Sequence, residues 1–480
     1  MKVEQLKRIH RISEVMKMNI EETSLQTVKQ AIQNQKSFFK NGHTRPISSR
    51  KETLQTLYRM IKDHEEDIIH ALQMDLNKSE METYATEIGI LLEEIRFVLK
   101  QIDEWAEPKK VKVAKTHIGS KSYSVPEPYG VTLIISPWNY PFQLALAPVI
   151  GAIAAGNTAI IKPSELTVHT SRLLERIISA RFDGHVLKVI EGGVETTGHL
   201  LDQPFDYIFF TGSVPVGKVV MEAASKRLIP VTLELGGKSP CIVDQTADIA
   251  LAAKRIAFGK VTNAGQTCIA PDYLFLHKSI KEQFITEFKN AVVTFYGPEP
   301  LKNDKYGRII NERHFDRIAS YLDDGEILLG GKLDRTFLKM EPTLMTPRDH
   351  SVPVMQEEIF GPVFPVLEYE NLEEVIDYVT ERPKPLALYL FTKNEATEAA
   401  ITGNISYGGG CINDTLMHIV TPYLPFGGVG ESGMGSYHGE SSFSTFSHYK
   451  SVMKQTNKFD MSFRYPNGKF GMQLIKKLLK

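Results

Sequence analysis

One cysteine in a short polar stretch has the setting of a catalytic nucleophile. Cys268 ends the run NAGQTC at 263–268, which follows a long helical pattern. Because a thiolate readily attacks a carbonyl carbon, a cysteine in such a loop suits covalent catalysis. The alternative is an inert side chain packed in the core, as for many free cysteines. The surrounding motifs must decide between these two interpretations.

Two further polar residues follow or interrupt strand-like apolar runs. Glu234 lies in VTLELGG at 231–237, and Asn139 lies in SPWNYP at 136–141. Burial would raise the pKa of Glu234 toward neutrality, which suits a general base, although a carboxylate facing outward from an edge strand fits equally well. The Asn139 amide can donate a hydrogen bond to an oxyanion, but an asparagine between two prolines is also ordinary turn chemistry.

Seven motifs, in order along the chain, resemble the aldehyde dehydrogenase superfamily between about residues 25 and 455. They are PWNYP at 137–141, KPSE at 162–165, FTGS at 210–213, LELGGKSP at 233–240, GQTC at 265–268, EEIFGPV at 357–363 and PFGGVGESGMGSYHG at 425–439. The last motif, with FSH at 446–448, is similar to the class 3 branch, whose members oxidise fatty and aromatic aldehydes.

The resemblance implies a mechanism for the three polar residues. Cys268 would attack the aldehyde, while the Asn139 amide and the backbone N–H of Cys268 would stabilise the oxyanion. Loss of hydride leaves a thioester, which Glu234 would help water to hydrolyse. Members that transfer the acyl group to coenzyme A tend to lack this glutamate, so Glu234 favours hydrolysis to the free acid. An acylating dehydrogenase and a non-catalytic structural or binding protein on the same fold remain as alternatives.

The resemblance also implies a dinucleotide site. Its expected contacts are Lys162, Glu165, Gly212, Ser213, Gly217, Glu358 and Phe360. Lys162 and Glu165 are assigned to the adenosine ribose, although without the family they would pass for a solvated surface pair. A carboxylate at Glu165 accepts a hydrogen bond from a ribose 2′-hydroxyl but repels a 2′-phosphate. We therefore expect NAD to be preferred, with NADP accepted less well.

The phosphate and nicotinamide ends of that site involve two other segments. GSVPVG at 212–217 opens a predicted helix whose amides could meet the pyrophosphate, with Ser213 assigned to it by the family. This spacing departs from the GxGxxG fingerprint, so on its own it indicates only a tight strand-to-helix turn. Glu358 and Phe360 are assigned to the nicotinamide ribose and ring.

A substrate tunnel is expected from positions that match the class 3 branch. These residues are Tyr140, Thr267, Leu416 and Ile419. Their largely apolar or aromatic character suits an alkyl or aryl chain, although core packing would explain them equally well.

The elements that must position these residues have an α/β pattern. From Tyr129 onward, continuous apolar strand-like runs alternate with helical patterns, which predicts parallel sheets covered on both faces. We expect two Rossmann-like, doubly wound domains and a small β arm that bridges subunits. The expected limits are 1–233 for the NAD-binding domain, with 108–128 in the arm, 234–416 for the catalytic domain, 417–455 for the bridging segment and 456–480 for a tail.

Composition and charge exclude several function classes. The 480 residues carry 56 basic and 57 acidic side chains, so no net field favours nucleic acid. Three cysteines, Cys241, Cys268 and Cys411, indicate a reducing compartment such as the cytoplasm. The 14 histidines show no metal-ligand spacing, so no metal is expected.

The two ends of the chain carry amphipathic patterns. Residues 1–18 predict an extra helix, and 469–480 places apolar and basic side chains on separate faces of a short helix. The C-terminal helix suits weak peripheral contact with an anionic membrane, although it would equally suit packing between subunits. The family expectation is a homodimer that acts on a small-molecule aldehyde.

Overall fold

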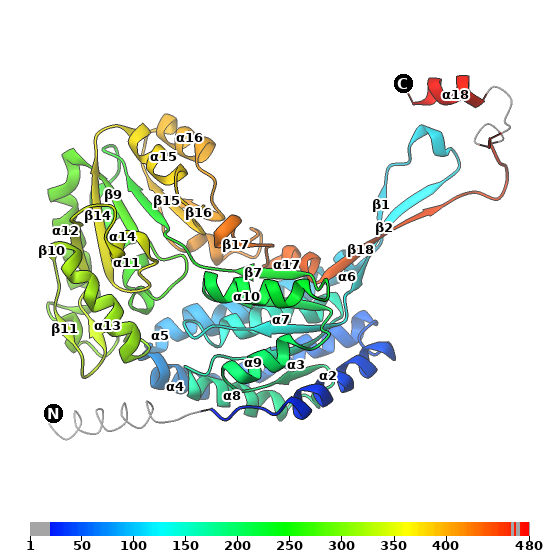
Figure 1. Cartoon of the computed structure of the whole chain (residues 1–480), viewed down its shortest axis with the longest axis horizontal. Helices are drawn as coiled ribbons and strands as arrows, with labels where there is room; N and C mark the ends of the chain where they lie inside the picture. The colour runs from blue at the N-terminus through cyan, green and yellow to red at the C-terminus, as the bar shows by residue number, and fades with distance from the viewer. Residues whose placement is uncertain (1–19, 462–464, 467–470, 480) are drawn as a thin grey trace.

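The computed structural model describes residues 20–461, 465–466 and 471–479, arranged as two α/β lobes with an arm projecting from one of them (Figure 1). The helix expected over 1–18 lies outside these residues. Within them, no helix combines the length and apolar character needed to cross a membrane.

The first lobe begins with a layer of helices: α2 (Leu25–Lys40), α3 (Ile47–Asp63), α4 (Glu65–Leu76), α5 (Glu80–Thr83) and α6 (Gly89–Ala106). A single π-helical turn, η1 (Tyr84–Ile88), joins α5 to α6. Local capping explains where α2 and α5 begin. The Ser24 hydroxyl accepts a hydrogen bond from Thr27 N, and the Ser79 hydroxyl accepts one from Glu82 N, each at 3.2 Å.

A six-stranded sheet forms the centre of this lobe, in the order β17-β7-β6-β3-β4-β5. Its strands are β3 (Val131–Ile135), β4 (Thr158–Lys162), β5 (Leu187–Val189), β6 (Tyr207–Thr211), β7 (Val231–Glu234) and β17 (Gly433–Met434). All neighbouring pairs are parallel except β17 with β7. The short strand β17 therefore returns from late in the chain and pairs Gly433 with Glu234.

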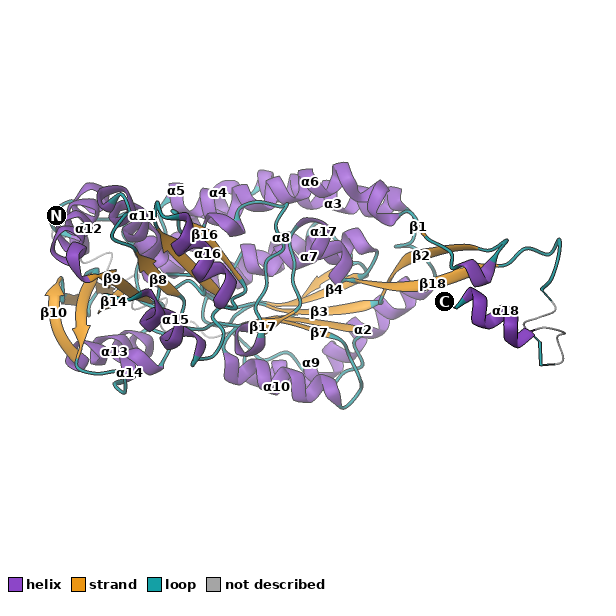
Figure 2. Ribbon diagram, turned by 90° about the horizontal axis from the view of Figure 1, so that it is seen from above, coloured by secondary structure: helices purple, strands orange, loops and turns teal. Residues whose placement is uncertain are grey.

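Helices cover both faces of this sheet, which is why β3 is buried along its whole length. They are α7 (Gln143–Ala155), α8 (Val168–Ser179), α9 (Val194–Leu201), α10 (Val214–Ser225) and α17 (Gly439–Thr445). Val131 and Leu133 pack with α2, α9 and α10, whereas Ile134 packs on the opposite face, where α7 lies. Figure 2 shows the sheet between these two helical layers.

The second lobe contains a seven-stranded sheet in the order β10-β13-β14-β9-β8-β15-β16. Its strands are β8 (Pro240–Val243), β9 (Tyr273–His277), β10 (Gly325–Leu329), β13 (Thr343–Pro347), β14 (Val363–Tyr369), β15 (Ala387–Phe391) and β16 (Gly409–Ile412). Only β10 is antiparallel to its neighbour. The lobe also holds the hairpin β11 (Leu333–Asp334) with β12 (Lys339–Met340), and the helices α11 (Ile249–Val261), α12 (Lys281–Tyr296), α13 (Glu312–Ser320), α14 (Pro353–Gln356), α15 (Leu372–Thr380) and α16 (Glu395–Asn404).

The arm is a three-stranded antiparallel sheet in the order β1-β2-β18. Its strands are β1 (Lys109–Val111), β2 (Lys121–Pro128) and β18 (Ser447–Lys454), and eight residues of β2 pair with eight of β18. It extends away from both lobes, and helix α18 (Gly471–Leu478) lies beside its outer end (Figures 1 and 2). The predicted fold class, two Rossmann-like α/β units and a small β arm, is thus confirmed, while the domain limits remain predictions.

Candidate active site

Cys268 follows a loop with an unusual backbone. Helix α11 ends at Val261, and the turn η3 (Thr262–Gly265) then contains three successive residues with positive φ: Asn263 at 50°, Ala264 at 52° and Gly265 at 76°. Such a conformation is costly for residues with a side chain, so surrounding contacts must hold it. Gly265 is required here for a second reason, because a Cβ would lie 2.3 Å from the carbonyl oxygen of Gly361.

Those contacts come largely from Gln266, whose side chain is fully buried. Its Nε2 donates to the carbonyl oxygens of Asn263 at 3.0 Å and Arg308 at 2.9 Å, and its Oε1 accepts from Ile310 N at 3.0 Å. One amide side chain therefore ties the loop both to itself and to the segment 308–310. The half-buried thiol of Cys268 follows two residues later.

Glu234 ends strand β7 and is buried. Neither of its carboxylate oxygens has a hydrogen-bond partner within the part of the chain that the structure describes, and burial raises the pKa of this group well above its usual range. The pKa of the Cys268 thiol is raised by burial and by the nearby carboxylates of Glu358 and Glu234. The nucleophile and base candidates therefore share one electrostatic environment.

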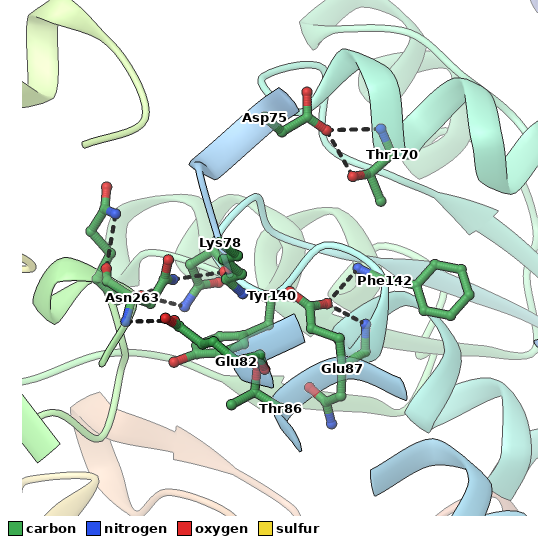
Figure 3. Close-up of polar contacts among 12 residues, drawn as sticks. Asp75, Lys78, Glu82, Thr86, Glu87, Tyr140, Phe142, Thr170 and Asn263 are labelled. Atoms are coloured by element: carbon green, nitrogen blue, oxygen red, sulfur yellow. Dashed lines mark hydrogen bonds and ion pairs between the residues drawn. The ribbon is translucent and has the colours of Figure 1, made fainter. Parts of the chain in front are cut away.

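Asn139 lies in the turn between β3 and α7 and is also buried. Its Nδ2 donates to the carbonyl oxygen of Gln266 at 3.2 Å, and its own carbonyl oxygen accepts from Asn263 Nδ2 at 2.8 Å. The third residue of the predicted set thus lies against the loop that carries Cys268. Figure 3 shows how this turn and the loop meet.

The four expected tunnel residues differ in how closely the structure links them to Cys268. The Tyr140 hydroxyl is 2.6 Å from Thr267 Oγ1, directly beside the cysteine. Leu416 is buried and has a φ of 65°. Its backbone N–H points to the Tyr389 hydroxyl, and that hydroxyl donates at 2.6 Å to the carbonyl oxygen of Ile269, the residue after Cys268. Ile419 is half-buried in the following turn.

The expected ribose contacts lie where β4 ends. Lys162 is its last residue and is buried, and its Nζ is 2.8 Å from Oε2 of the more exposed Glu165. The sequence left open a solvated surface pair, but the ammonium is shielded from water while the carboxylate faces outward. The carboxyl ends of parallel strands are where doubly wound sheets bind dinucleotides.

The expected phosphate contacts lie at the next strand end. Gly212 and Ser213 follow β6, and Ser213 is the N-cap of α10, whose first turn receives no side-chain cap. The positive end of this twelve-residue helix therefore suits a pyrophosphate. Gly217 packs against Leu235, whose Cδ2 would lie 2.6 Å from a Cβ at that position.

A cavity of about 230 Å³ joins this helix to the expected nicotinamide contacts. Val214, Gly236 and Glu358 line it. Oε1 of Glu358 is buried and lacks a hydrogen-bond partner among residues 20–461, and a Cβ at Gly236 would lie 2.1 Å from Oε2. Burial and the Asp272 carboxylate raise the pKa of Glu358 to about 8. An unpaired acceptor beside a glycine fits a ribose hydroxyl, so these residues fit a dinucleotide.

Phe360 lies two residues further on, with a φ of 51°. Its ring meets the Trp138 ring edge-on, with centroids 5.3 Å apart. Trp138 directly precedes Asn139, so this aromatic contact links the expected nicotinamide side to the expected oxyanion donor. In the same described residues, no group of three or more histidine, cysteine or acidic side chains is placed to hold a metal ion.

Sequence reasoning missed three charged residues, two buried and one half-buried, that support these loops. Lys78, Glu82 and Glu87 contact the segments of Asn139 and Asn263, although they lie more than fifty residues earlier in the chain. The only local signal is a run of charged residues after helix α4, which resembles any solvated surface. Gln266 stood inside the GQTC motif, but nothing in its neighbours indicated a structural role.

Comparisons with known proteins agree with this geometry. A sequence profile of the aldehyde dehydrogenase family matches residues 2–452. The chain is 46% identical to aldehyde dehydrogenase family 3 member A2 of Macaca fascicularis, over 91% of this chain and 90% of that protein. It is 44% identical to the dimeric NADP-preferring aldehyde dehydrogenase of Canis lupus familiaris, over 92% and 97%.

A solved structure described as the substrate-bound state of Staphylococcus aureus AldH has the same fold. It superposes with a TM-score of 0.92 at 48% identity and covers 94% of this chain and 99% of that one. The resemblance first inferred from seven motifs is therefore confirmed over almost the whole length. The chain belongs to the aldehyde dehydrogenase family, in its class 3 branch, and it is an enzyme that oxidises aldehydes to carboxylic acids with NAD or NADP.

Proposed function

We propose that this enzyme oxidises medium- to long-chain aliphatic or aromatic aldehydes, with Cys268 as nucleophile, Glu234 as general base and Asn139 as oxyanion donor. One observation carries the proposal. Glu234 is buried beside Cys268, and both of its oxygens lack partners among the described side chains. A carboxylate that stabilises structure would be hydrogen-bonded, so an unpaired one suits a group that must exchange a proton.

The first half-reaction forms a bond between sulfur and carbon. The carboxylate form of Glu234 takes the proton of the Cys268 thiol as the sulfur attacks the aldehyde carbon. The C=O bond becomes a C–O⁻ bond, and the Asn139 Nδ2 and the Cys268 N–H stabilise the charge. When bound, the nicotinamide cofactor accepts the hydride that this adduct loses, which restores C=O and leaves a thioester on Cys268.

The second half-reaction cleaves the thioester with water. Glu234 first releases to solvent the proton that it took from the thiol. It then removes a proton from the water, whose oxygen adds to the thioester carbon, and the C–S bond breaks. Sulfur leaves as a thiolate and regains a proton, and the acid is released. The raised pKa of Glu234 makes its carboxylate a stronger base, so we expect the rate of this step to rise with pH as Glu234 loses its proton.

Cofactor choice should favour NAD, although not strongly. Unit charges about 5 Å apart repel by roughly 3 kcal/mol at an effective dielectric constant of about 20, which would oppose a 2′-phosphate near Glu165. The ammonium of Lys162, 2.8 Å from that carboxylate, offsets part of this repulsion. We therefore propose that NAD is preferred and NADP accepted, in contrast to the relative that is named NADP-preferring.

The substrate class follows from the walls proposed for the tunnel, Tyr140, Thr267, Leu416 and Ile419. These side chains are mainly hydrocarbon and aromatic, and the Tyr140 hydroxyl lies 2.6 Å from Thr267 Oγ1, beside Cys268. Burying each methylene of an alkyl chain against such a wall contributes about 0.8 kcal/mol. Catalytic efficiency should therefore rise with chain length until the tunnel is filled.

Steady-state NADH formation across straight-chain aldehydes tests these proposals. We expect kcat/KM to increase from short to medium chains, with NAD giving the higher value, and with no consumption of coenzyme A. Consumption of coenzyme A in step with NADH would support the acylating alternative. Absence of NADH with every aldehyde would support a non-catalytic protein, and an NADP value equal to or above that of NAD would refute the cofactor preference.

We also propose the domain limits of 1–233, 234–416 and 417–455.

We further propose that the enzyme is a homodimer assembled through the arm. Val111 on β1 and Met453 on β18 are each about half exposed, at 51% and 52%, on a sheet that neither lobe covers. A single sheet needs another layer packed on its face to bury such apolar side chains, and a second copy of the chain would supply that layer.

For the tail, we propose weak contact with an anionic membrane through α18, in a protein otherwise located in the cytoplasm. Of the segment 469–480, the structure describes 471–479, in which Met472 is exposed and Lys476 and Lys477 occupy the last turn. The helix also lies against 115–117, which suits a packing role instead. Unchanged co-sedimentation with anionic vesicles after deletion of 469–480 would refute the membrane contact.

A further inference from the structure

The segment 78–87, which follows α4 and runs into η1, reaches both loops of the candidate active site. It starts at Lys78, whose ammonium is fully buried and forms an ion pair with Glu87. Lys78 Nζ also donates to the carbonyl oxygen of Asn139 at 3.0 Å and lies 3.8 Å from the centroid of the Tyr140 ring. The Lys78 side chain, paired with Glu87, therefore lies directly against the peptide that carries the proposed oxyanion donor (Figure 3).

Glu87 holds the other end of the same turn. Its second oxygen accepts hydrogen bonds from Phe142 N at 3.0 Å and Gln143 N at 2.9 Å, at the start of helix α7. Negative charge is favourable at a helix N-terminus, where backbone N–H groups lack partners. The turn 139–143 is thus held at its carbonyl end by Lys78 and at its amide end by Glu87, and the two charges neutralise each other.

Glu82 connects this segment to the loop of Cys268. Its Oε1 accepts from Asn263 N at 2.8 Å, at the first of the three residues with positive φ. Asn263 Nδ2 in turn donates to the carbonyl oxygens of Asn139 at 2.8 Å and Gln266 at 3.1 Å. One segment of ten residues therefore fixes both partners of the proposed oxyanion site relative to each other.

We propose that Lys78, Glu82 and Glu87 are positioning residues that set the Asn139 amide against Cys268 for stabilisation of the oxyanion. The inference rests on the proposed roles of Asn139 and Cys268. Stability alone does not explain a fully buried ion pair, because an apolar pair of similar volume is often as stable or more stable. Positioning does explain it, because a displacement of about 1 Å in a catalytic group costs about 10²-fold in rate.

The first experiment compares Lys78→Met, Glu87→Gln and the variant with both substitutions. Glu87→Gln alone leaves a buried unpaired ammonium, so we expect it to lower the melting temperature most. The double variant removes both charges and should recover the melting temperature. It should still lose about 10- to 100-fold in kcat with little change in KM, because Asn139 has lost its cationic contact.

Two further measurements separate positioning from a general loss of structure. Alkylation of Cys268 by iodoacetamide needs no oxyanion donor, so its rate should stay close to that of the unaltered enzyme. With an aldehyde deuterated at the carbonyl carbon, the isotope effect on kcat should increase, because the step that breaks the C–H bond becomes slower. Unchanged isotope effects or a matching loss of alkylation would overturn the inference.

A double-mutant cycle with Asn139→Ala gives the sharpest test. If Lys78 acts through Asn139, Lys78→Met should cost at most about twofold in kcat in the Asn139→Ala background. An undiminished loss there would overturn the positioning role alone. Full activity of Asn139→Ala would instead overturn the proposed function of that residue, so the two failures are distinguishable.

Matched variants guard against failure to fold. Asp75→Asn alters another buried carboxylate at the end of α4, which accepts from Thr170 N at 2.8 Å (Figure 3). Among the described residues, this carboxylate has no hydrogen bond to 139–143 or 262–268. It should lower the melting temperature and leave kcat/KM within about twofold. Glu82→Ala removes a half-buried residue, so it tests the positioning role without disturbing the buried ion pair. An unchanged kcat in this variant would count against Glu82. Glu82→Gln should recover activity, because its side-chain oxygen can still accept from Asn263 N.

Discussion

The loop of Cys268 and the β arm are stabilised in opposite ways. The loop takes its shape from buried polar groups that lie far apart in sequence, in 78–87, 139–143 and 308–310. The arm depends on main-chain pairing between β2 and β18, and most of its side chains are half or fully exposed.

The difference indicates what each region needs in order to work. The loop contains a costly run of positive φ angles, and a single chain supplies every contact that we find holding it. The arm is well paired along its strands but lacks a second layer over its faces within the described residues. Substitutions around the loop should therefore change the catalytic rate, and substitutions on the arm should change the strength of dimer formation.

The largest expected effect concerns the loop. Cys268→Ser should reduce NADH formation by on the order of 10⁴-fold or more, because the weaker nucleophile cannot form the thioester efficiently. The dimer and the melting temperature should be unchanged. Cys411→Ser is the matched control, since that thiol lies 3.4 Å from His418 Nδ1 and outside the proposed reaction. Comparable losses in both variants would contradict the assignment of the nucleophile.

The next effect tests the turn that faces the loop. Asn139→Ala should lower kcat by about 10²- to 10³-fold, equivalent to about 2.7 to 4 kcal/mol, because one oxyanion donor is lost. KM should change little, since the amide acts on the charge that develops during reaction. Stopped-flow measurement of the first turnover checks this. A rise in KM with unchanged kcat would point to substrate binding instead.

A smaller effect is expected on the arm. Met453→Asp should weaken dimer formation about tenfold, because it places a charge on a surface proposed to face a second copy. Activity per subunit at high concentration should remain within about twofold. Analytical ultracentrifugation measures the dissociation constant, and Leu333→Asp, at the exposed hairpin of the second lobe, serves as control. Equal effects of the two substitutions would remove the arm from the interface.

The smallest effect compares a buried acid with an exposed one. In the unfolded chain Glu358 loses its proton near pH 4.5, whereas burial and the Asp272 carboxylate hold its folded pKa at about 8. Between these values the folded state binds more protons, so the free energy of unfolding falls as pH rises. Glu358→Gln removes this cost, and its melting temperature should exceed that of the unaltered enzyme by about 2 °C at pH 8 but not at pH 4.

The arm supplies the control for this last comparison. Glu127 Oε2 lies 2.6 Å from Lys450 Nζ at the surface, where water screens the pair. Glu127→Gln should therefore change stability by less than about 1 kcal/mol. A pH-dependent gain in this variant as large as that of Glu358→Gln would contradict the role of burial.

Sequence reasoning predicted the elements better than their contacts. The apolar run at 131–135 predicted a buried parallel strand, and the motifs around Cys268, Glu234 and Asn139 predicted residues that the fold brings to one region. Local patterns could not predict the ion pair of Lys78, because its partners follow from packing between segments that are distant in the chain. The positive φ of Ala264 was equally hidden, since alanine rarely adopts it.

The late strand β17 has a consequence for the order in which the enzyme becomes competent. Gly433 lies beside Glu234 in the sheet, although the two are 199 positions apart in the chain. A nascent chain that has emerged only to residue 420 would carry the thiol and its loop, yet the base would still border an unpaired sheet edge. With Glu234 as the proposed base, aldehyde oxidation should therefore begin only when synthesis is nearly complete.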